Sequence, residues 1–300
     1  MSEQPFRGKV VWITGASSGI GRALALAFGH AGARLILSAR TAGALEEVAK
    51  ASGAETTVLP LDLTDLSALP AVAARAEAAF GRVDIMVHNA GVAVRARAAD
   101  VGLEVHERVL RTNYLGPVLL TQALLPGMVA RGGGRFVVIS GLSGKYASPL
   151  LGAYAASKHA LHGFFDTLRG EELEHGITVT IVIPGFIRTE ITAHALTGSG
   201  ERFGRVLPIY REAMAPEECA ARILAAVARG RREVLVGGPE VWTAWLHRLS
   251  PALAERVVWG HPVKLRNRLR AALRMSRRRQ RAEAAVVRER GRGPGGPAGE

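Results

Sequence analysis

Residues 9–21, KVVWITGASSGIG, join a short apolar run to a glycine-rich turn and the start of a helical pattern. The apolar run predicts a buried strand, and residues 20–30 predict the helix that follows it. Glycines at such a turn allow tight bending and close approach of a ligand to the backbone. The helix then offers unpaired N–H groups and the positive end of its dipole to a pyrophosphate. The alternative is an ordinary strand-to-helix turn, but this position favours a nucleotide-binding loop.

Strand and helix patterns alternate along most of the chain. Further apolar runs occupy residues 34–38, 56–61, 83–88, 135–140, 178–183 and 233–236. Helical patterns cover residues 41–51, 66–80, two stretches that end near 131, and 152–175. Continuous apolar strands linked by helices are typical of a parallel sheet that is buried on both faces. We predict a doubly wound α/β sheet of about seven strands in one domain, residues 5–240, with ligands at the carboxyl ends of the strands.

The positive charge of the chain is concentrated near its C-terminal end. The 300 residues carry a formal net charge of +13, of which residues 261–300 contribute +9, from 12 Lys and Arg against 3 Glu. The high isoelectric point therefore describes the end of the chain more than the domain. The single cysteine, Cys219, cannot form an internal disulfide, and we see neither a secretory leader nor a membrane-spanning run. We expect a cytoplasmic protein.

Tyr154-Ala-Ala-Ser-Lys158 places a phenol and an ammonium on one face of a predicted helix. An ammonium beside a phenol favours the phenolate and lowers a pKa that is otherwise about 10. The pair therefore predicts a proton donor that works near neutral pH. The pattern is short, and it gains weight from the nucleotide loop upstream.

Three motifs occur in a fixed order: the glycine-rich loop, Asn89-Ala90-Gly91 after the fourth strand, and Tyr154-x-x-x-Lys158. Together they resemble the short-chain dehydrogenase/reductase family over about residues 5–240. The resemblance implies a Rossmann-type domain, NAD(H) or NADP(H), and hydride transfer at a carbonyl or alcohol carbon.

The same resemblance implies roles for three polar residues. Tyr154 would act as general acid/base on the carbonyl oxygen, Lys158 would hold the nicotinamide ribose, and Asn113 would position a water near the lysine. A locally bonded helix-interior amide is the alternative for Asn113.

One residue of the family pattern is missing. The family places a serine thirteen residues before the tyrosine, and that position is Gly141, flanked by Ser140 and Ser143. Three interpretations are open for the missing hydroxyl. Ser143 could reach into the site, Ser140 could do so after a shift of the loop, or Tyr154 and water could polarise the carbonyl alone. We favour Ser143, because the fifth strand should turn Ser140 toward the sheet. Losing such a donor typically slows a reaction by about a hundredfold or more.

The end of the second strand indicates which nicotinamide nucleotide is bound. An acidic residue there would bind the adenosine ribose and repel a 2′-phosphate, but the strand ends Ser38-Ala39-Arg40. Arg40 can pair with the phosphate and Ser38 can add a hydroxyl, so NADP(H) is favoured over NAD(H). The alternative is that Arg40 is only a solvated loop charge.

The resemblance implies a set of cofactor contacts across the strand ends. Asp62 is expected at the adenine, although it also suits a turn cap; Asn89 is expected to brace the sheet edge. The full set is Thr14, Gly15, Ser17, Ser18, Gly19, Ile20, Gly21, Ser38, Arg40, Asp62, Leu63, Asn89, Ala90, Gly91, Tyr154, Lys158, Pro184, Gly185, Ile187 and Thr189. We interpret His88 and His159 as packing residues, and no cluster has metal-ligand spacing.

Residues 186–215 interrupt the strand–helix pattern and predict a mobile lid. Its apolar residues favour a small apolar substrate with a carbonyl or secondary alcohol, and its arginines serve either an acidic group or the solvent. Residues 241–275 predict a basic amphipathic extension that lies on a membrane, or packs on the domain or a second subunit. Residues 276–300 predict a disordered tail. We also expect a homo-oligomer, and no recognised motif suggests nucleic-acid binding.

The sequence thus predicts an NADP(H)-dependent carbonyl reductase or alcohol dehydrogenase. Because of Gly141, the first alternative is a nucleotide-binding sensor or scaffold with weak or lost catalysis. A Rossmann-type methyltransferase is a further, weaker alternative.

Overall fold

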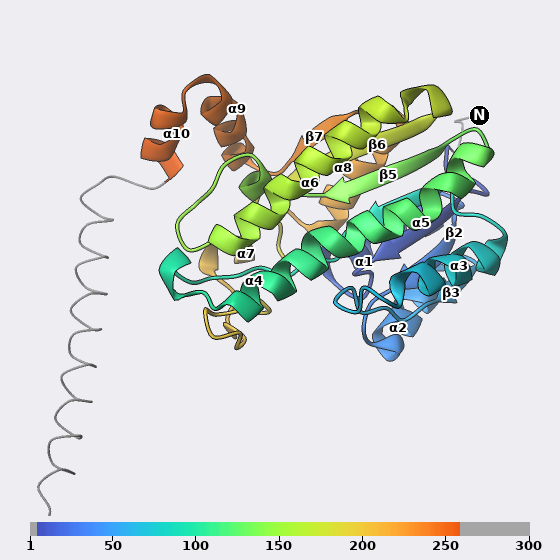
Figure 1. Cartoon of the computed structure of the whole chain (residues 1–300), viewed down its shortest axis with the longest axis horizontal. Helices are drawn as coiled ribbons and strands as arrows, with labels where there is room; N and C mark the ends of the chain where they lie inside the picture. Colours follow the sequence, from blue (N-terminus) through green and yellow to red (C-terminus); the bar gives the residue numbers. More distant parts are fainter. Residues whose placement is uncertain (1–4, 259–300) are drawn as a thin grey trace, which may run out of the picture. The chain divides into compact units, whose positions relative to one another are not determined.

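The computed structural model describes residues 5–258, and these contain a parallel sheet of seven strands (Figure 1). The strand order is β3-β2-β1-β4-β5-β6-β7, with every neighbouring pair parallel. The strands are β1 Val10–Thr14, β2 Arg34–Ser38, β3 Thr56–Val58, β4 Ile85–His88, β5 Gly134–Ile139, β6 Ile177–Pro184 and β7 Glu233–Val236. The predicted doubly wound α/β sheet is therefore confirmed, and β1 and β4 flank the point where the strand order reverses.

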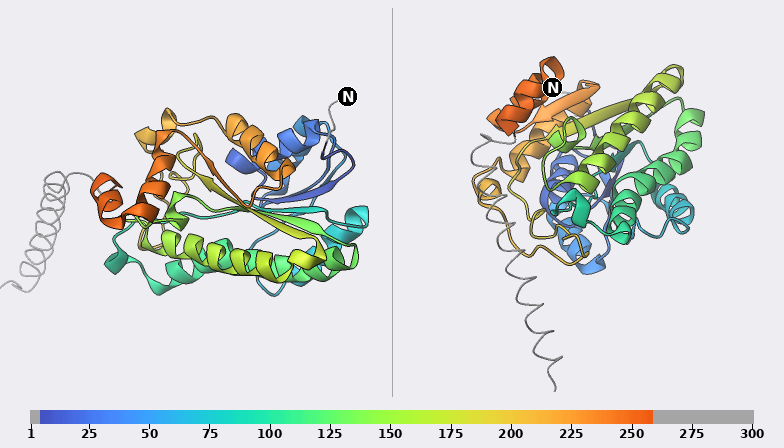
Figure 2. Two further views of the ribbon diagram at one scale, coloured as in Figure 1. Left: turned by 90° about the horizontal axis from the view of Figure 1, so that it is seen from above. Right: turned by 60° about the vertical axis from the view of Figure 1, so that its left-hand side comes forward.

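Helices cover both faces of this sheet, as the left view of Figure 2 shows. Helix α1 packs against α2 and α8 on one face, while α3 packs against α5 and α4 against α6. The helices are α1 Gly19–His30, α2 Ala42–Ser52, α3 Leu69–Phe80, α4 Leu103–Leu110, α5 Gly116–Ala130, α6 Gly152–Glu171, α7 Pro208–Arg211 and α8 Pro216–Ala228. Helix α8 is absent from the predicted elements, although Pro216 followed by two glutamates is a helix-start signal.

The glycine-rich turn between β1 and α1 depends on residues without side chains. Gly15 has a φ of +66°, and a Cβ atom there would lie 2.8 Å from the Cα of Ala90. A Cβ at Gly21 would overlap the carbonyl oxygen of Gly15. The turn therefore packs too closely against α1 and the end of β4 for any larger residue.

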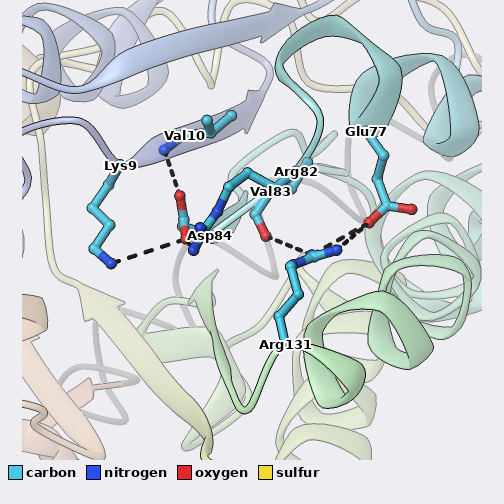
Figure 3. Close-up of polar contacts among 7 residues, drawn as sticks. All are labelled: Lys9, Val10, Glu77, Arg82, Val83, Asp84 and Arg131. Carbon is cyan, nitrogen blue, oxygen red and sulfur yellow. Dashed lines mark hydrogen bonds and ion pairs between the residues drawn. The ribbon is translucent and has the colours of Figure 1, made fainter.

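The amino-terminal ends of β1 and β4 are joined by polar contacts (Figure 3). The buried Asp84 carboxylate accepts the Val10 N–H at 2.8 Å and forms an ion pair with Arg82. Lys9 lies 4.0 Å from the same carboxylate. Arg131 bridges the Glu77 carboxylate and the carbonyl oxygen of Val83. These contacts fix the pairing of the two strands at the edge opposite the predicted ligand site.

The chain divides into a compact unit that runs through Trp245 and a second that begins at Leu246. Near this boundary lie α9 Trp242–Leu249 and, in the second unit, α10 Pro251–Val258. The predicted basic extension, residues 241–275, is thus two short helices as far as residue 258. Its remainder and the predicted disordered tail, residues 276–300, lie outside the described residues. Between residues 5 and 258, none of the helices has the length and apolarity that crossing a membrane requires.

Candidate active site

A cavity of about 1110 Å³ opens at the carboxyl ends of the strands, a volume slightly above the usual range of about 300–1,000 Å³ for small-molecule sites. Its walls come from the residues that end or follow β1 to β6, together with part of α4 and part of the lid. Of the predicted cofactor positions, all except Gly21 line this cavity. Ser140 also lines it, whereas Asn113 and Ser143 do not.

Asn89 ties the end of β4 to the glycine-rich loop. Its Nδ2 donates to the carbonyl oxygens of Thr14 at 3.0 Å and Gly15 at 3.1 Å. The Thr14 hydroxyl accepts the backbone N–H groups of Asn89 and Ala90 in return. Asn89 therefore braces the sheet edge as the sequence predicted, and its amide protons are used within the protein.

Lys158 is buried in the cavity wall and lies one helical turn after Tyr154 on α6. Its Nζ donates to the carbonyl oxygen of Ile139 at 2.7 Å and lies 5.7 Å from the centre of the Tyr154 ring. Burial lowers the pKa of Lys158 to about 8, because no counter-charge compensates the desolvated ammonium. The amine is therefore mostly protonated at neutral pH.

Burial also raises the pKa of the Tyr154 phenol above its usual range, and the charge of Tyr210 adds to that increase. The predicted lowering of the Tyr154 pKa by Lys158 is thus not found in this structure. Burial disfavours the charged phenolate, whereas the nearby Lys158 ammonium favours it. Burial has the larger effect, because Lys158 is itself desolvated. Tyr154 is a protonated donor at neutral pH.

Gly141 stands next to the Tyr154 hydroxyl. A Cβ atom at Gly141 would lie 3.8 Å from Tyr154 Oη, with ordinary van der Waals space around it. Its φ of +148°, however, is a conformation that side-chain-bearing residues rarely adopt. The loop that follows β5 is thus shaped for glycine at the position where the family has its serine.

Of the two neighbouring serines, Ser140 is already hydrogen-bonded and Ser143 lies outside the cavity lining. Ser140 is buried, and its Oγ forms a 3.0 Å hydrogen bond with Nε2 of His162 on α6. Burial lowers the pKa of His162 to about 4, so this ring is neutral at neutral pH. Ser140 thus lines the cavity with its hydroxyl engaged by helix α6, and the prediction that it turns toward the sheet is not confirmed. Ser143 lies in a single turn of 3-10 helix outside the cavity lining, and its predicted role stays a prediction.

Asn113 lies in a π-helical turn, Arg111–Leu115, between α4 and α5. Such turns occur frequently at functional sites. The Asn113 amide oxygen accepts the Val92 N–H at 2.8 Å, and Nδ2 donates to the Val92 carbonyl and to Ser157 Oγ. All three partners lie outside its own helix, so the locally bonded alternative is wrong. The amide joins the chain after Gly91 to α6, and its predicted positioning of a water stays untested.

At the predicted adenosine end of the cavity, Ser38 differs from its predicted role, whereas Arg40 remains available for a ligand. The Ser38 hydroxyl is buried, donates to the Leu59 carbonyl at 2.6 Å and accepts from Trp12 Nε1 at 2.9 Å. It therefore has no proton left for a phosphate, and its predicted contact through the hydroxyl is wrong. Arg40 is exposed at the cavity wall and forms no ion pair with any residue between 5 and 258.

Asp62 has the turn geometry that the sequence left open. Its Oδ1 accepts the backbone N–H of Thr64 at 2.9 Å and the Thr64 hydroxyl at 2.8 Å. This pattern caps the turn after β3. Asp62 and Leu63 both line the cavity as well, so the turn holds them where the adenine contact is predicted.

The two histidines near the motifs lie outside the cavity lining. His88 is buried against Phe136 and Phe165, its Nε2 bonds to Thr121 Oγ1 at 2.8 Å, and burial lowers its pKa to about 3. His159 bonds back to the Ala155 carbonyl of its own helix. No group of side chains suited to a metal ion occurs within residues 5–258.

Several lining residues were not predicted as site residues. Arg22 follows the glycine loop, Arg108 and Arg111 come from α4 and the π-helical turn, and Tyr210 comes from the lid helix α7. The signal that points to Arg22 is its place directly after Gly21. No spacing rule brings the α4 and lid residues to the same cavity, because their placement depends on how these segments pack.

Comparison with known proteins identifies the family to which this site belongs. The family model described as short chain dehydrogenase matches residues 9–199. The "Dehydrogenase/reductase SDR family protein 7-like" of Drosophila melanogaster is 43% identical over 268 residues, which cover 87% of this chain and 82% of that protein. The bovine "Dehydrogenase/reductase SDR family member 7B" is 40% identical, covering 84% and 81% respectively. The chain belongs to the short-chain dehydrogenase/reductase family and is an NAD(P)-dependent oxidoreductase.

Solved structures with the same fold contain both kinds of nicotinamide cofactor. A short-chain dehydrogenase from Streptomyces avermitilis has a TM-score of 0.72 at 32% identity, covering 83% of this chain and 96% of that one. A Burkholderia phymatum protein in complex with NAD has a TM-score of 0.74 at 25% identity, with the same two coverages. A metagenomic oxidoreductase in complex with NADP has a TM-score of 0.64 at 31% identity, covering 77% and 98%.

Proposed function

We propose that this enzyme uses NADP(H) to interconvert a carbonyl group and a secondary alcohol on a small apolar substrate, with Tyr154 as general acid/base. The observation that carries the proposal is one cavity lined by the glycine-rich loop, by Tyr154 and by Lys158. The close-packed glycine turn and the start of α1 suit a pyrophosphate, because they leave backbone N–H groups accessible. The residues present therefore fit a dinucleotide.

The bound nicotinamide supplies or accepts the hydride, and the chain controls the proton. Because the Tyr154 pKa is raised, its hydroxyl holds the proton that neutralises a developing alkoxide. Lys158 uses one ammonium proton on Ile139, and its other protons suit the ribose hydroxyls. A protonated phenol can donate its proton in carbonyl reduction, and the resulting phenolate can accept it in the reverse reaction.

Substitution of Tyr154 tests the enzymatic proposal directly. Tyr154→Phe keeps the ring and removes the donor, so NADPH-dependent reduction across a panel of carbonyl compounds should fall by about a hundredfold or more. Tyr146→Phe is the matched control, because the Tyr146 hydroxyl bonds to Thr243 and neither residue lines the cavity. NADPH consumption followed by absorbance is the measurement.

A specific observation also supports a second candidate function. Gly141 removes a hydroxyl donor next to Tyr154, and a nucleotide sensor or scaffold would tolerate that loss. Tight NADPH binding without Tyr154-dependent turnover of any carbonyl would favour this sensor. Turnover that Tyr154→Phe abolishes would exclude it.

Arg40 is the residue on which the preference for NADP(H) depends. It is exposed at the cavity wall with no ion-pair partner in the described part of the chain, which suits a 2′-phosphate. Hydrogen bonds between charged groups contribute about 1.5–3 kcal/mol, so Arg40→Asp should weaken NADPH binding by roughly 10- to 100-fold.

The matched control for Arg40→Asp is Lys50→Asp, which makes the same charge change on exposed α2 outside the cavity lining. Calorimetry with NADPH and NADH is the measurement for both variants. Equal weakening of both cofactors by Arg40→Asp, or an equal effect of Lys50→Asp, would contradict the proposed preference.

The apolar substrate is proposed from the apolar residues in the cavity lining. They include Val92 and Ala93 after β4 and Ile191, Leu196 and Tyr210 of the lid. Such residues are typical of sites for small organic ligands. Within the carbonyl panel, rates should therefore rise with the apolar area of the compound.

A further inference from the structure

The carbonyl end of the site has one hydrogen-bond donor fewer than the family pattern. Gly141 brings no hydroxyl, Ser140 is bonded to His162, and Ser143 lies outside the lining. A carbonyl oxygen that gains negative charge is stabilised most by two donors aimed at it. Another part of the cavity wall can supply such a donor.

The chain has four tyrosines, and each phenol hydroxyl is a possible donor. Tyr114 packs against Phe164, and the Tyr146 hydroxyl bonds to Thr243 Oγ1 at 2.6 Å. Neither lines the cavity, whereas Tyr154 and Tyr210 both do.

Tyr210 is held by its ring and backbone while its hydroxyl remains free. The ring packs edge to face against Phe186, with centroids 5.3 Å apart, and the backbone N–H donates to Leu207. Among the described residues, no hydrogen-bond partner of Tyr210 Oη is found. Burial raises its pKa, so the hydroxyl keeps its proton at neutral pH. Tyr210 and Tyr154 line the same cavity, and the charge of Tyr210 contributes to the raised pKa of Tyr154.

We propose that Tyr210 is a second catalytic residue, whose hydroxyl donates a hydrogen bond to the substrate carbonyl oxygen in place of the serine that Gly141 lacks. The proton that forms the alcohol comes from the O–H bond of Tyr154, and Tyr210 keeps its own proton throughout. The lid thus completes the site only when α7 lies over it. This proposal rests on the proposed carbonyl chemistry.

Tyr210→Phe tests the proposal, because it removes the hydroxyl and keeps the ring against Phe186. With a carbonyl that the wild type reduces, kcat should fall by about a hundredfold, while KM and NADPH affinity change little. Tyr146→Phe should leave kcat unchanged. Gly141→Ser in the Tyr210→Phe background should then recover part of the rate, and Gly141→Ala in the same background controls for strain at that backbone position.

The outcomes separate this proposal from the one on which it rests. Loss of turnover in Tyr154→Phe with full kcat in Tyr210→Phe would overturn the role of Tyr210 and keep the carbonyl chemistry. An effect of Tyr210→Phe on KM alone would assign Tyr210 to substrate packing and also overturn its role. No wild-type turnover of any carbonyl would overturn both.

A separate observation concerns an exposed apolar surface on α9, which we call the α9 face. It consists of Trp242, Trp245 and Leu249, whose side chains are 73%, 52% and 84% exposed. Residues three and four apart on a helix share one side, so these three form a single stripe along α9. Exposed tryptophans on one helix side mark an interaction surface more often than a free one.

The basic residues on α9 and in the chain that follows it indicate the kind of partner. His247 and Arg248 lie in the last turn of α9, and Arg256 lies in the last turn of α10. Residues 261–300 then add a net charge of +9 to the chain that follows. Tryptophan prefers the membrane–water interface, and Lys and Arg side chains are attracted to an anionic leaflet. We infer that the α9 face binds the surface of a bilayer that contains anionic lipid.

Sedimentation of the full chain with vesicles tests this inference. Vesicles of phosphatidylcholine with about 30% phosphatidylglycerol should pellet the protein, and pure phosphatidylcholine should not, because each basic residue contributes only with anionic lipid. The double variant Trp242→Glu/Trp245→Glu should weaken binding at least about tenfold, because it places charge in the apolar face. Leu173→Glu is the matched control, since Leu173 is 62% exposed on a different part of the surface.

Equal pelleting with both vesicle types, or equal loss in the Leu173→Glu control, would overturn the membrane inference. So would a dimer in light scattering that the double variant separates, because that result would assign the α9 face to a second copy of the chain.

Discussion

The amino-terminal and carboxyl-terminal ends of the strands, called here the two edges of the sheet, use polar residues in opposite ways. At the amino-terminal edge, Asp84 is bonded to Val10 and paired with Arg82, and Arg131 bridges to Glu77 (Figure 3). At the carboxyl-terminal edge, Arg40 and the hydroxyls of Tyr154 and Tyr210 line a cavity without comparable pairing in the described residues. Paired groups hold strands together, whereas unpaired groups remain available to a ligand.

This difference predicts separate consequences for substitutions at the two edges. Changes at the amino-terminal edge should lower the free energy of unfolding and leave cofactor affinity intact. Changes at the carboxyl-terminal edge should alter affinity or turnover with little loss of stability, because their partners are supplied by ligands.

The largest effect is expected at the glycine-rich loop. Gly21→Ala introduces a Cβ that overlaps the Gly15 carbonyl and lies against the Asn89 amide, so the loop has to open. NADPH affinity should fall by about a hundredfold or more, since several backbone hydrogen bonds of about 1 kcal/mol each are misaligned together. Calorimetry measures the affinity, and circular dichroism should show that helix content is kept.

Gly43→Ala is the matched control for the loop, because a Cβ at Gly43 on α2 meets nothing within 4 Å. It should leave NADPH affinity unchanged. If the NADPH affinity of Gly21→Ala stayed within a few-fold of that of the wild type, close packing of the turn would not be what holds the loop in its binding conformation.

A smaller effect, on stability alone, is expected at the opposite edge. Asp84→Ala leaves the Val10 N–H and the Arg82 guanidinium without their buried acceptor. Such unsatisfied groups typically cost about 1–3 kcal/mol each, so the free energy of unfolding should fall by about 2 kcal/mol. Urea denaturation measures that loss, and KM for NADPH should not change.

Asp100→Ala is the control for Asp84→Ala. Asp100 forms an exposed pair with Arg97 at 4.0 Å, and such pairs contribute about 0–1 kcal/mol. If both variants lose equal stability, or if Asp84→Ala changes KM, the two edges do not divide stability and binding in the way inferred here.

The sequence predicted the cofactor half of this cavity better than the carbonyl half. The strand ends and the glycine turn follow from local periodicity and from backbone sterics, which act over a few residues. Asn89 and Arg40 were predicted at the cavity because each directly follows a strand. A doubly wound sheet with its ligand site at the carboxyl ends of the strands was expected from the alternation of strands and helices, whereas the strand order came from the structure.

The carbonyl half depends on contacts between distant segments. The Ser38 hydroxyl is turned to Leu59 and Trp12, and no spacing rule reveals that a side chain is already bonded. Tyr210 enters the cavity on a lid whose path is set by packing and not by periodicity. The pKa of Tyr154 also depends on how deeply its side chain is buried. The four-residue spacing between Tyr154 and Lys158 does not predict that burial.

The smallest effect on stability is expected at Lys158, where function and stability oppose each other. Its folded-state pKa of about 8 lies below the usual lysine value of 10.5, so the unfolded chain binds more protons between these two pH values. The free energy of unfolding should therefore rise as pH increases from about 8 to about 10.5. At pH 7 the buried ammonium costs stability, and Lys158→Met should raise Tm by about 2–4 °C, the shift expected for about 1 kcal/mol.

That advantage of Lys158→Met should shrink as the pH approaches 10.5, because the wild-type amine then loses its charge, while NADPH-dependent turnover should be lost at every pH. Lys50→Met, which replaces an exposed lysine, should show no such pH-dependent difference in scanning calorimetry. A Lys158→Met variant that is less stable than the wild type at pH 7 would mean that the hydrogen bond to Ile139 outweighs the desolvation of the ammonium. The catalytic edge would then add to the stability of the sheet, as the amino-terminal edge does, and the contrast between the two would be lost.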